Sequence, residues 1–146
     1  MKVSGISLIF LVCAFGLIPG ISALSPEIDN GYSVRPANDL FLPSVIMPMS
    51  TGTIGQGQTV YYSKYVSSGT MAIYPDLNWG DTSDSLTLTI SAPDATLGPY
   101  NDASDGVING RIYLSVSKPS GLTPGSWSFR VYGEHVTGVQ GFSFNV

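Results

Sequence analysis

Apolar and polar residues alternate along several segments of the chain, and this alternation is the main structural signal in the sequence. Every second residue in these segments is aliphatic or aromatic, and the residues between them are mostly polar. The clearest segments are residues 86–91, 112–117, 127–132 and 142–146. A period of two predicts strands with one buried and one solvent-facing side, as in antiparallel sheets that pack face to face.

Two earlier segments, residues 59–66 and 70–74, also have the composition of strands and are separated by the turn sequence Ser67-Ser68-Gly69. No sustained helical spacing of apolar residues follows residue 23. We therefore expect an all-β fold, an antiparallel β-sandwich or jelly roll of about seven or eight strands, formed by residues 51–146.

Residues 24–50 are less regular, because Pro26, Pro36, Pro43 and Pro48 interrupt them. We interpret this segment as an extended lead-in to the sandwich. A peripheral strand is expected at about residues 41–47.

Residues 1–23 have the pattern of a secretory signal peptide. Lys2 precedes an apolar stretch over residues 6–18, Pro19-Gly20 follows, and Ala23 is a small residue suited to signal peptidase cleavage. The alternative is an uncleaved membrane anchor, which the helix break after residue 18 disfavours. The sequence predicts a secreted or cell-surface protein, with no membrane insertion after cleavage.

The charge of the chain excludes some partners. The whole chain has 6 Lys and Arg against 10 Asp and Glu, and removal of Lys2 with the leader makes the net charge −5. An acidic surface disfavours nucleic acid and anionic lipid. The only cysteine, Cys13, lies in the predicted leader. The mature domain therefore has no disulfide and must be held together by its core, by a metal ion or by assembly.

Acidic residues gather between residues 65 and 110, where there is no lysine or arginine. Carboxylate, amide and hydroxyl oxygens on loops are the ligands that calcium prefers, so calcium is a possible cofactor. The alternative is that these residues only form turns. The candidate ligands are Asp76, Asn78, Asp81 and Asp84 in one loop region, and Asp102 and Asp105 in another.

Catalytic signals are weak. His135 is the only histidine, in a segment expected to be a turn, and no Gly-x-Ser-x-Gly motif is present to position a nucleophile. The mature chain also has no thiol. We expect no enzyme, and a small hydrolase that uses paired aspartates is the alternative.

Four tyrosines fall on the less apolar sides of their expected strands: Tyr61, Tyr65, Tyr113 and Tyr132. On one outer face they could stack on sugar rings or contact a protein. The alternative is that they only cover a sheet, as tyrosines often do. Trp127 falls on an apolar row and is expected in the core.

Three stretches resemble a known family: TGTIGQGQTVYYSKYVSSG (residues 51–69), the aspartate-bearing segment at residues 76–84, and LTPGSWSFRVYG (residues 122–133). Together they resemble the pre-peptidase C-terminal domain, a β-sandwich attached to many secreted proteases. WGDTSDSLTLTISAPDA (residues 79–95) is also similar to the jelly-roll P domain of proprotein convertases. Both resemblances imply a non-catalytic extracellular accessory domain, in families with calcium-binding members.

These observations lead to one main functional hypothesis and two alternatives. The main hypothesis is a secreted, non-catalytic module that binds an extracellular protein or polysaccharide. A self-assembling surface or filament subunit is the first alternative, since residues 24–50 could pair with the sheet edge of a neighbour. The small hydrolase is the second.

Overall fold

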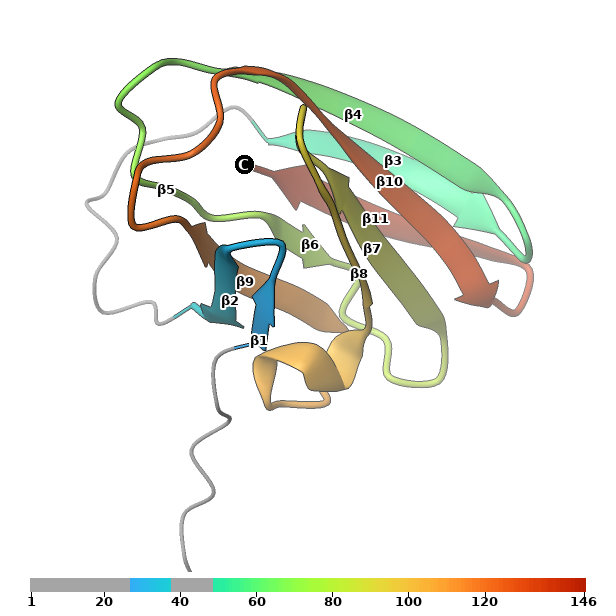
Figure 1. Ribbon diagram of the computed structural model, residues 1–146. Coiled ribbons are helices and arrows are strands. Elements are labelled where there is room, and N and C mark those ends of the chain that lie inside the picture. The colour runs from blue at the N-terminus through green and yellow to red at the C-terminus, as the bar shows by residue number, and fades with distance from the viewer. Residues whose placement is uncertain (1–26, 38–48) are drawn as a thin grey trace, which may run out of the picture.

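The computed structural model describes residues 27–37 and 49–146, most of which lie in strands (Figure 1). One short 3-10 helix, η2 (Asp102–Asp105), interrupts the strands. The strands are β1 (Glu27–Asp29), β2 (Tyr32–Pro36), β3 (Ser50–Gly55), β4 (Thr59–Val66), β5 (Ala72–Ile73), β6 (Asp76–Asn78), β7 (Ser85–Ser91), β8 (Thr96–Tyr100), β9 (Arg111–Ser117), β10 (Gly125–His135) and β11 (Val139–Asn145).

The strands form two antiparallel sheets. The seven-stranded sheet has the order β1-β2-β9-β6-β11-β3, and β5 pairs with β9 on the side opposite β2, where β6 also lies. The four-stranded sheet has the order β4-β10-β7-β8. The inner faces of the two sheets supply a single core, in which Trp127, Phe129 and Val131 of β10 are completely buried. Alternation along each strand produces this core, because it turns every second side chain inward.

The N-terminal hairpin of β1 and β2 is part of the seven-stranded sheet. Strand β2 pairs with β9, which follows it by about 80 residues, so that Val34 lies opposite Val116. Tyr32 is completely buried, and its ring meets that of Trp127 edge-on, with 5.6 Å between the ring centroids. The described part of the expected lead-in therefore contributes to the core.

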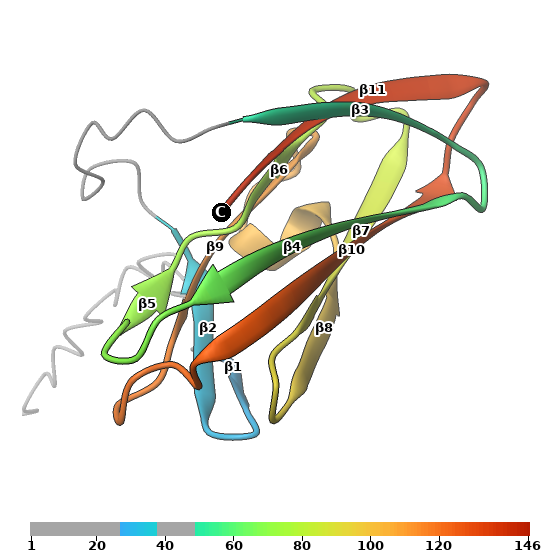
Figure 2. The same cartoon turned by 90° about the horizontal axis from the view of Figure 1, so that it is seen from above.

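Two neighbouring corners carry the chain from one sheet to the other at the same end of the molecule (Figure 2). One joins β3 to β4 and the other joins β10 to β11. They touch through their backbones: the Gly57 N–H donates to the Gly133 carbonyl, and the Gly133 N–H donates to the Gln58 carbonyl. A Cβ atom on Gly133 would lie 2.3 Å from the Gly55 carbonyl oxygen, so only glycine fits there.

The prediction of an all-β antiparallel sandwich is confirmed. The described residues contain eleven strands where about seven or eight were expected, because the N-terminal hairpin and the short strands β5 and β6 also join the sheets. The predicted leader and the expected strand at residues 41–47 lie outside the described residues. Within the described part of the chain, no helix is long and apolar enough to span a bilayer.

Candidate functional site

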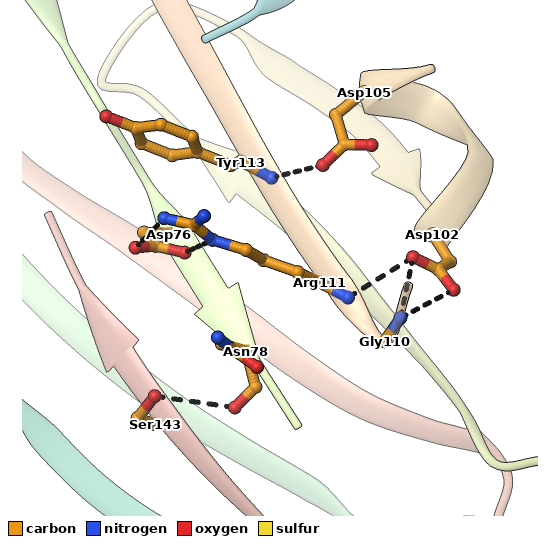
Figure 3. Close-up of polar contacts among 8 residues, drawn as sticks. All are labelled: Asp76, Asn78, Asp102, Asp105, Gly110, Arg111, Tyr113 and Ser143. Carbon is orange, nitrogen blue, oxygen red and sulfur yellow. Dashed lines mark hydrogen bonds and ion pairs between the residues drawn. The ribbon is translucent and has the colours of Figure 1, made fainter. Parts of the chain in front are cut away.

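Three of the predicted calcium ligands contact strand β9, one through an ion pair and two through backbone N–H groups (Figure 3). Asp76, on the neighbouring strand β6, forms a bidentate ion pair with Arg111. The Nε atom of Arg111 donates to Oδ1 of Asp76 at 2.7 Å, and Nη2 donates to Oδ2 at 2.9 Å. The Arg111 guanidinium also lies 4.4 Å from the centre of the Tyr113 ring. This carboxylate therefore already has a cation as its partner.

Asp102, in η2, is buried and accepts hydrogen bonds from the backbone at the start of β9. Its carboxylate receives the N–H groups of Asn109 at 3.1 Å, Gly110 at 3.0 Å and Arg111 at 3.2 Å. The Gly110 carbonyl in turn accepts the N–H groups of Trp79 and Gly80, both at 2.8 Å. Asp102 thus joins η2 to β9, and Gly110 joins β9 to the loop after β6.

Asp105, at the other end of η2, also binds backbone groups. It accepts the Val107 N–H at 3.1 Å and the Tyr113 N–H at 3.0 Å. Burial of the carboxyl group raises the pKa of Asp105, and the two backbone hydrogen bonds oppose this rise.

The remaining predicted ligands lie at the end of β6 and in the loop between β6 and β7. Asp84 is buried and accepts the Thr137 N–H at 2.9 Å, while the exposed Asp81 accepts the N–H and the hydroxyl group of Ser83 at 2.8 and 2.7 Å. These two hydrogen bonds lower the pKa of Asp81, and the hydrogen bond from the Ser83 hydroxyl has the larger effect on the pKa. The Asn78 side chain is exposed, and its backbone carbonyl accepts the Ser143 hydroxyl.

The predicted ligands do not converge on one calcium site. Among the residues that the structure describes, no three His, Cys, Asp or Glu side chains are grouped closely enough to hold a metal ion. Asp84 and Asp102 do line one shallow hollow of about 210 Å³, together with Glu134, which the sequence did not point to. Both already accept backbone N–H groups, so the arrangement does not fit an ion. Calcium binding stays a prediction that this geometry does not support.

Asp94, in the turn between β7 and β8, also accepts several hydrogen bonds, although the sequence did not identify it as a site residue. It accepts the Tyr32 hydroxyl at 2.6 Å, Lys118 Nζ at 2.8 Å and the Thr123 hydroxyl at 2.8 Å. These partners hold the pKa of Asp94 well below its ordinary value, and the hydrogen bond from Lys118 has the largest effect. Because Tyr32 lies in the seven-stranded sheet and Asp94 in a turn that joins two strands of the other sheet, this cluster connects the two layers at one end of the sandwich.

The outer face of the four-stranded sheet has a different character, and we call its aromatic part, formed by Tyr61, Tyr65, Arg130 and Tyr132, the tyrosine face. Tyr61 and Tyr65 of β4 are 66% and 72% exposed. In the strand register Arg130 of β10 lies opposite Tyr61, and its guanidinium is 5.2 Å from the centre of the Tyr132 ring.

Hydroxyl groups surround the tyrosine face. Outward positions around the tyrosines are serine or threonine: Ser63 on β4, Ser126 and Ser128 on β10, and Thr89 and Ser91 on β7. Thr87 of β7, which lies opposite Tyr132, is buried. The four strands of the sheet contain one acidic residue, Glu134, which lies beyond the register shift at Gly133 near the end of β10. This face therefore combines aromatic, hydroxyl and cationic groups in a chain that is acidic as a whole.

The expected grouping of four tyrosines holds for three of them and was wrong for Tyr113. Tyr113 is 5% exposed and belongs to β9 in the other sheet, where Arg111 covers its ring. Trp127 is in the core as expected. His135 ends β10 and is exposed.

No family model matches the chain. Over 43 residues it is 44% identical to an uncharacterized protein of Archaeoglobus fulgidus, an alignment that covers 30% of this chain and 59% of that relative. The chain spans less than two thirds of the length of that relative, and the similarity carries neither a family nor an activity.

Proposed function

We propose that the protein is an extracellular, non-catalytic β-sandwich module that binds a polysaccharide through the tyrosine face. The observation that carries this proposal is the exposure of Tyr61 and Tyr65, together with Arg130 and Tyr132, on one face of one sheet. Large exposed aromatic groups that cluster on one surface commonly mark a binding site.

The chemistry of this face suits sugar rings. A tyrosine ring has an apolar face that stacks on the C–H groups of a pyranose and a hydroxyl that can form hydrogen bonds. Tyr61 and Tyr65 are four residues apart on one strand, a span of roughly 13 Å at about 3.3 Å per residue. A polymer chain that runs along β4 would meet both rings. The serine and threonine rows beside them supply hydrogen-bond donors and acceptors to sugar hydroxyls.

Arg130 places a positive charge on the tyrosine face, and tyrosines that only cover a sheet would not require one. It is exposed, and its cross-strand neighbours are Tyr61 and Thr89, neither of which is acidic. A guanidinium held against aromatic rings can donate several hydrogen bonds to sugar hydroxyls or to a uronate carboxylate. An extracellular protein is the other partner class that such a face fits.

The extracellular location rests on the predicted leader at residues 1–23. Mass spectrometry of exported protein should find a chain that begins at or near Leu24. An exported chain that keeps Met1 would contradict a cleaved leader and favour a membrane anchor.

Binding can be tested by co-sedimentation with insoluble cellulose, chitin and cross-linked polygalacturonate. A double variant, Tyr61→Ala with Tyr65→Ala, should bind the retained polysaccharide roughly 30-fold more weakly, at about 1 kcal/mol for each lost stacking contact. Val139→Ala is a matched control, because Val139 is 72% exposed but lies on the other sheet.

Two results would contradict the proposal. One is the absence of binding by the folded native chain to all three probes. The other is binding that the tyrosine double variant and the Val139→Ala control share equally. Retention by a protein partner, lost in the same double variant, would move the proposal to the second partner class.

A further inference from the structure

The two sheets end in four edge strands, and these edges differ in how well they are protected. An exposed edge has unpaired backbone donors and acceptors that can accept a strand from another chain. Proteins block such pairing with short strands, proline, glycine-rich bulges or charged side chains. The edges are β1 and β3 in the seven-stranded sheet and β4 and β8 in the four-stranded sheet.

Two of the edges have such protection. Strand β1 has only three residues. Strand β8 contains Gly98 and Pro99, and its register with β7 shifts between Leu88 and Ile90. Strand β3 keeps an unbroken register with β11 and is not protected in this way, but its exposed positions have no side chain larger than threonine and so offer a second copy no aromatic contacts.

Of these protecting features, strand β4 has only a charged side chain. It has eight residues, contains no proline or glycine, and keeps an unbroken register with β10 from Thr59 to Val66. Its only charged residue is Lys64, whose Nζ donates to the Val146 carbonyl oxygen, in the seam where the edge of β4 faces the end of β11. No described strand pairs with the other side of β4.

The outward side chains of β4 are also arranged symmetrically. Ser63 lies midway between Tyr61 and Tyr65, and all three are exposed. When two such strands pair antiparallel about Ser63, Tyr61 of one copy lies opposite Tyr65 of the other, and this pair occurs twice. Cross-strand aromatic pairs stabilise antiparallel sheets, and no like charges meet on this face.

We propose that a second copy of this chain pairs with the free edge of β4, antiparallel and centred on Ser63. The contact is isologous, because each copy offers the same strand to the other. It adds backbone hydrogen bonds between the edges and joins the two four-stranded sheets into one continuous sheet. The four tyrosines of the two copies then lie in one row on the same outer face.

The first test is sedimentation of the native chain over a range of concentrations, together with the variants Ser63→Lys and Ser63→Glu. The native chain should form dimers. Each variant should be at least tenfold less associated, because like charges then face each other across the two-fold axis. An equal mixture of the two variants should recover a heterodimer. Ser126→Lys is the control, because Ser126 is an exposed serine on the same face but inside the sheet, opposite Tyr65.

Disulfide trapping provides an independent test. Directly opposed residues on antiparallel strands have Cα atoms about 4.5–5.5 Å apart, within the range that a disulfide spans. In a background where the only cysteine, Cys13, is changed to serine, Ser63→Cys should form a covalent dimer under mild oxidation. Ser126→Cys in the same background should not.

The proposal is contradicted if the native chain stays monomeric at all concentrations, which would leave the β4 edge to a strand from a different protein. It is also contradicted by a dimer that both charge variants leave intact, or by equal trapping of the two cysteine variants. Because these tests measure association alone, their failure leaves polysaccharide binding by the monomer unaffected.

Discussion

The aspartate loops and the tyrosine face are the two most distinctive regions of this chain, and they use their polar groups in opposite ways. By the aspartate loops we mean the end of β6, the loop that follows it, and η2. Their carboxylates already have partners within the protein: Arg111 for Asp76, and backbone N–H groups for Asp84, Asp102 and Asp105. On the tyrosine face, Tyr61, Tyr65 and Arg130 are directed to solvent.

This difference separates stabilising groups from groups available for binding. A carboxylate that accepts several N–H groups fixes a loop, and an incoming ion would have to displace those donors. Exposed rings on the outer face of a sheet contribute little to the fold and remain free to bind. The contrast predicts that substitutions in the loops change stability, while substitutions on the tyrosine face change binding and association.

The largest effect is expected for Asp102→Ala. The substitution removes the acceptor of three backbone N–H groups and leaves those of Gly110 and its neighbours without a partner in a buried place. Buried unpaired groups cost about 1–3 kcal/mol each and their costs are not additive, so we expect a loss of about 3 kcal/mol. Calorimetry should show the Tm fall by roughly 10 °C. Asp81→Ala, at an exposed position, should cause a much smaller fall, and equal falls would contradict the contrast.

A smaller effect is expected from Asp94→Asn in acid. Lys118 and two hydroxyl groups hold the pKa of Asp94 below its ordinary value, so the unfolded chain takes up a proton before the folded chain does. The stability that Asp94 contributes is present above about pH 4 and is lost as the pH falls further. The urea midpoint of the native chain, measured from pH 6 to pH 2, should fall more steeply than that of the variant. The difference should be modest, because the Asp94 side chain is 40% exposed. Parallel curves would show that the Asp94 cluster adds nothing to the fold.

Tyr61→Thr should change stability by no more than about 0.5 kcal/mol, as expected at an exposed strand position that keeps a β-branched residue. The measurement is a denaturant midpoint on the same chain that is used for the polysaccharide assay. A stability loss as large as that of Asp102→Ala would mean that the tyrosine face is structural.

Calcium should have no effect if the aspartates only stabilise loops. If calcium binds as the sequence predicts, calcium at a hundred times its Kd should raise the free energy of unfolding by about 2.7 kcal/mol. The Tm should then rise by about 10 °C. The arrangement of the carboxylates predicts coincident melting curves in calcium and in chelator. A rise of several degrees would show that the loops rearrange around an ion, and Asp84, Asp102 and Glu134 would then be the first residues to substitute.

Alternation in the sequence predicted the strands well where packing is local. The expected segment 59–66 is strand β4 itself, and the apolar rows of β7, β9 and β10 all face the core. Alternation assigns side chains to two opposite faces but does not say what covers each face. Tyr113 was misplaced for this reason: its face of β9 is covered by Arg111, a contact that the strand pattern does not encode.

The aspartates could not be assigned from sequence for a different physical reason. The partners of Asp102 and Asp105 are mainly backbone N–H groups, which every residue except proline has. A loop aspartate that binds its own backbone therefore has the same sequence signature as one that binds calcium. The ion pair between Asp76 and Arg111 was missed because the two residues are 35 positions apart and meet only through the pairing of β6 with β9.

The position of β11 between β6 and β3 has a consequence for the order in which the molecule forms. Strand β11 is the last strand along the chain but an inner strand of its sheet, and β10, just before it, is an inner strand of the other. Strands β3, β4, β6 and β7 are synthesised earlier and gain these partners only when residues 125–145 have emerged from the ribosome. A growing chain therefore cannot complete either sheet before that point. Both sheets gain an inner strand from the same late segment, so they close together rather than one after the other.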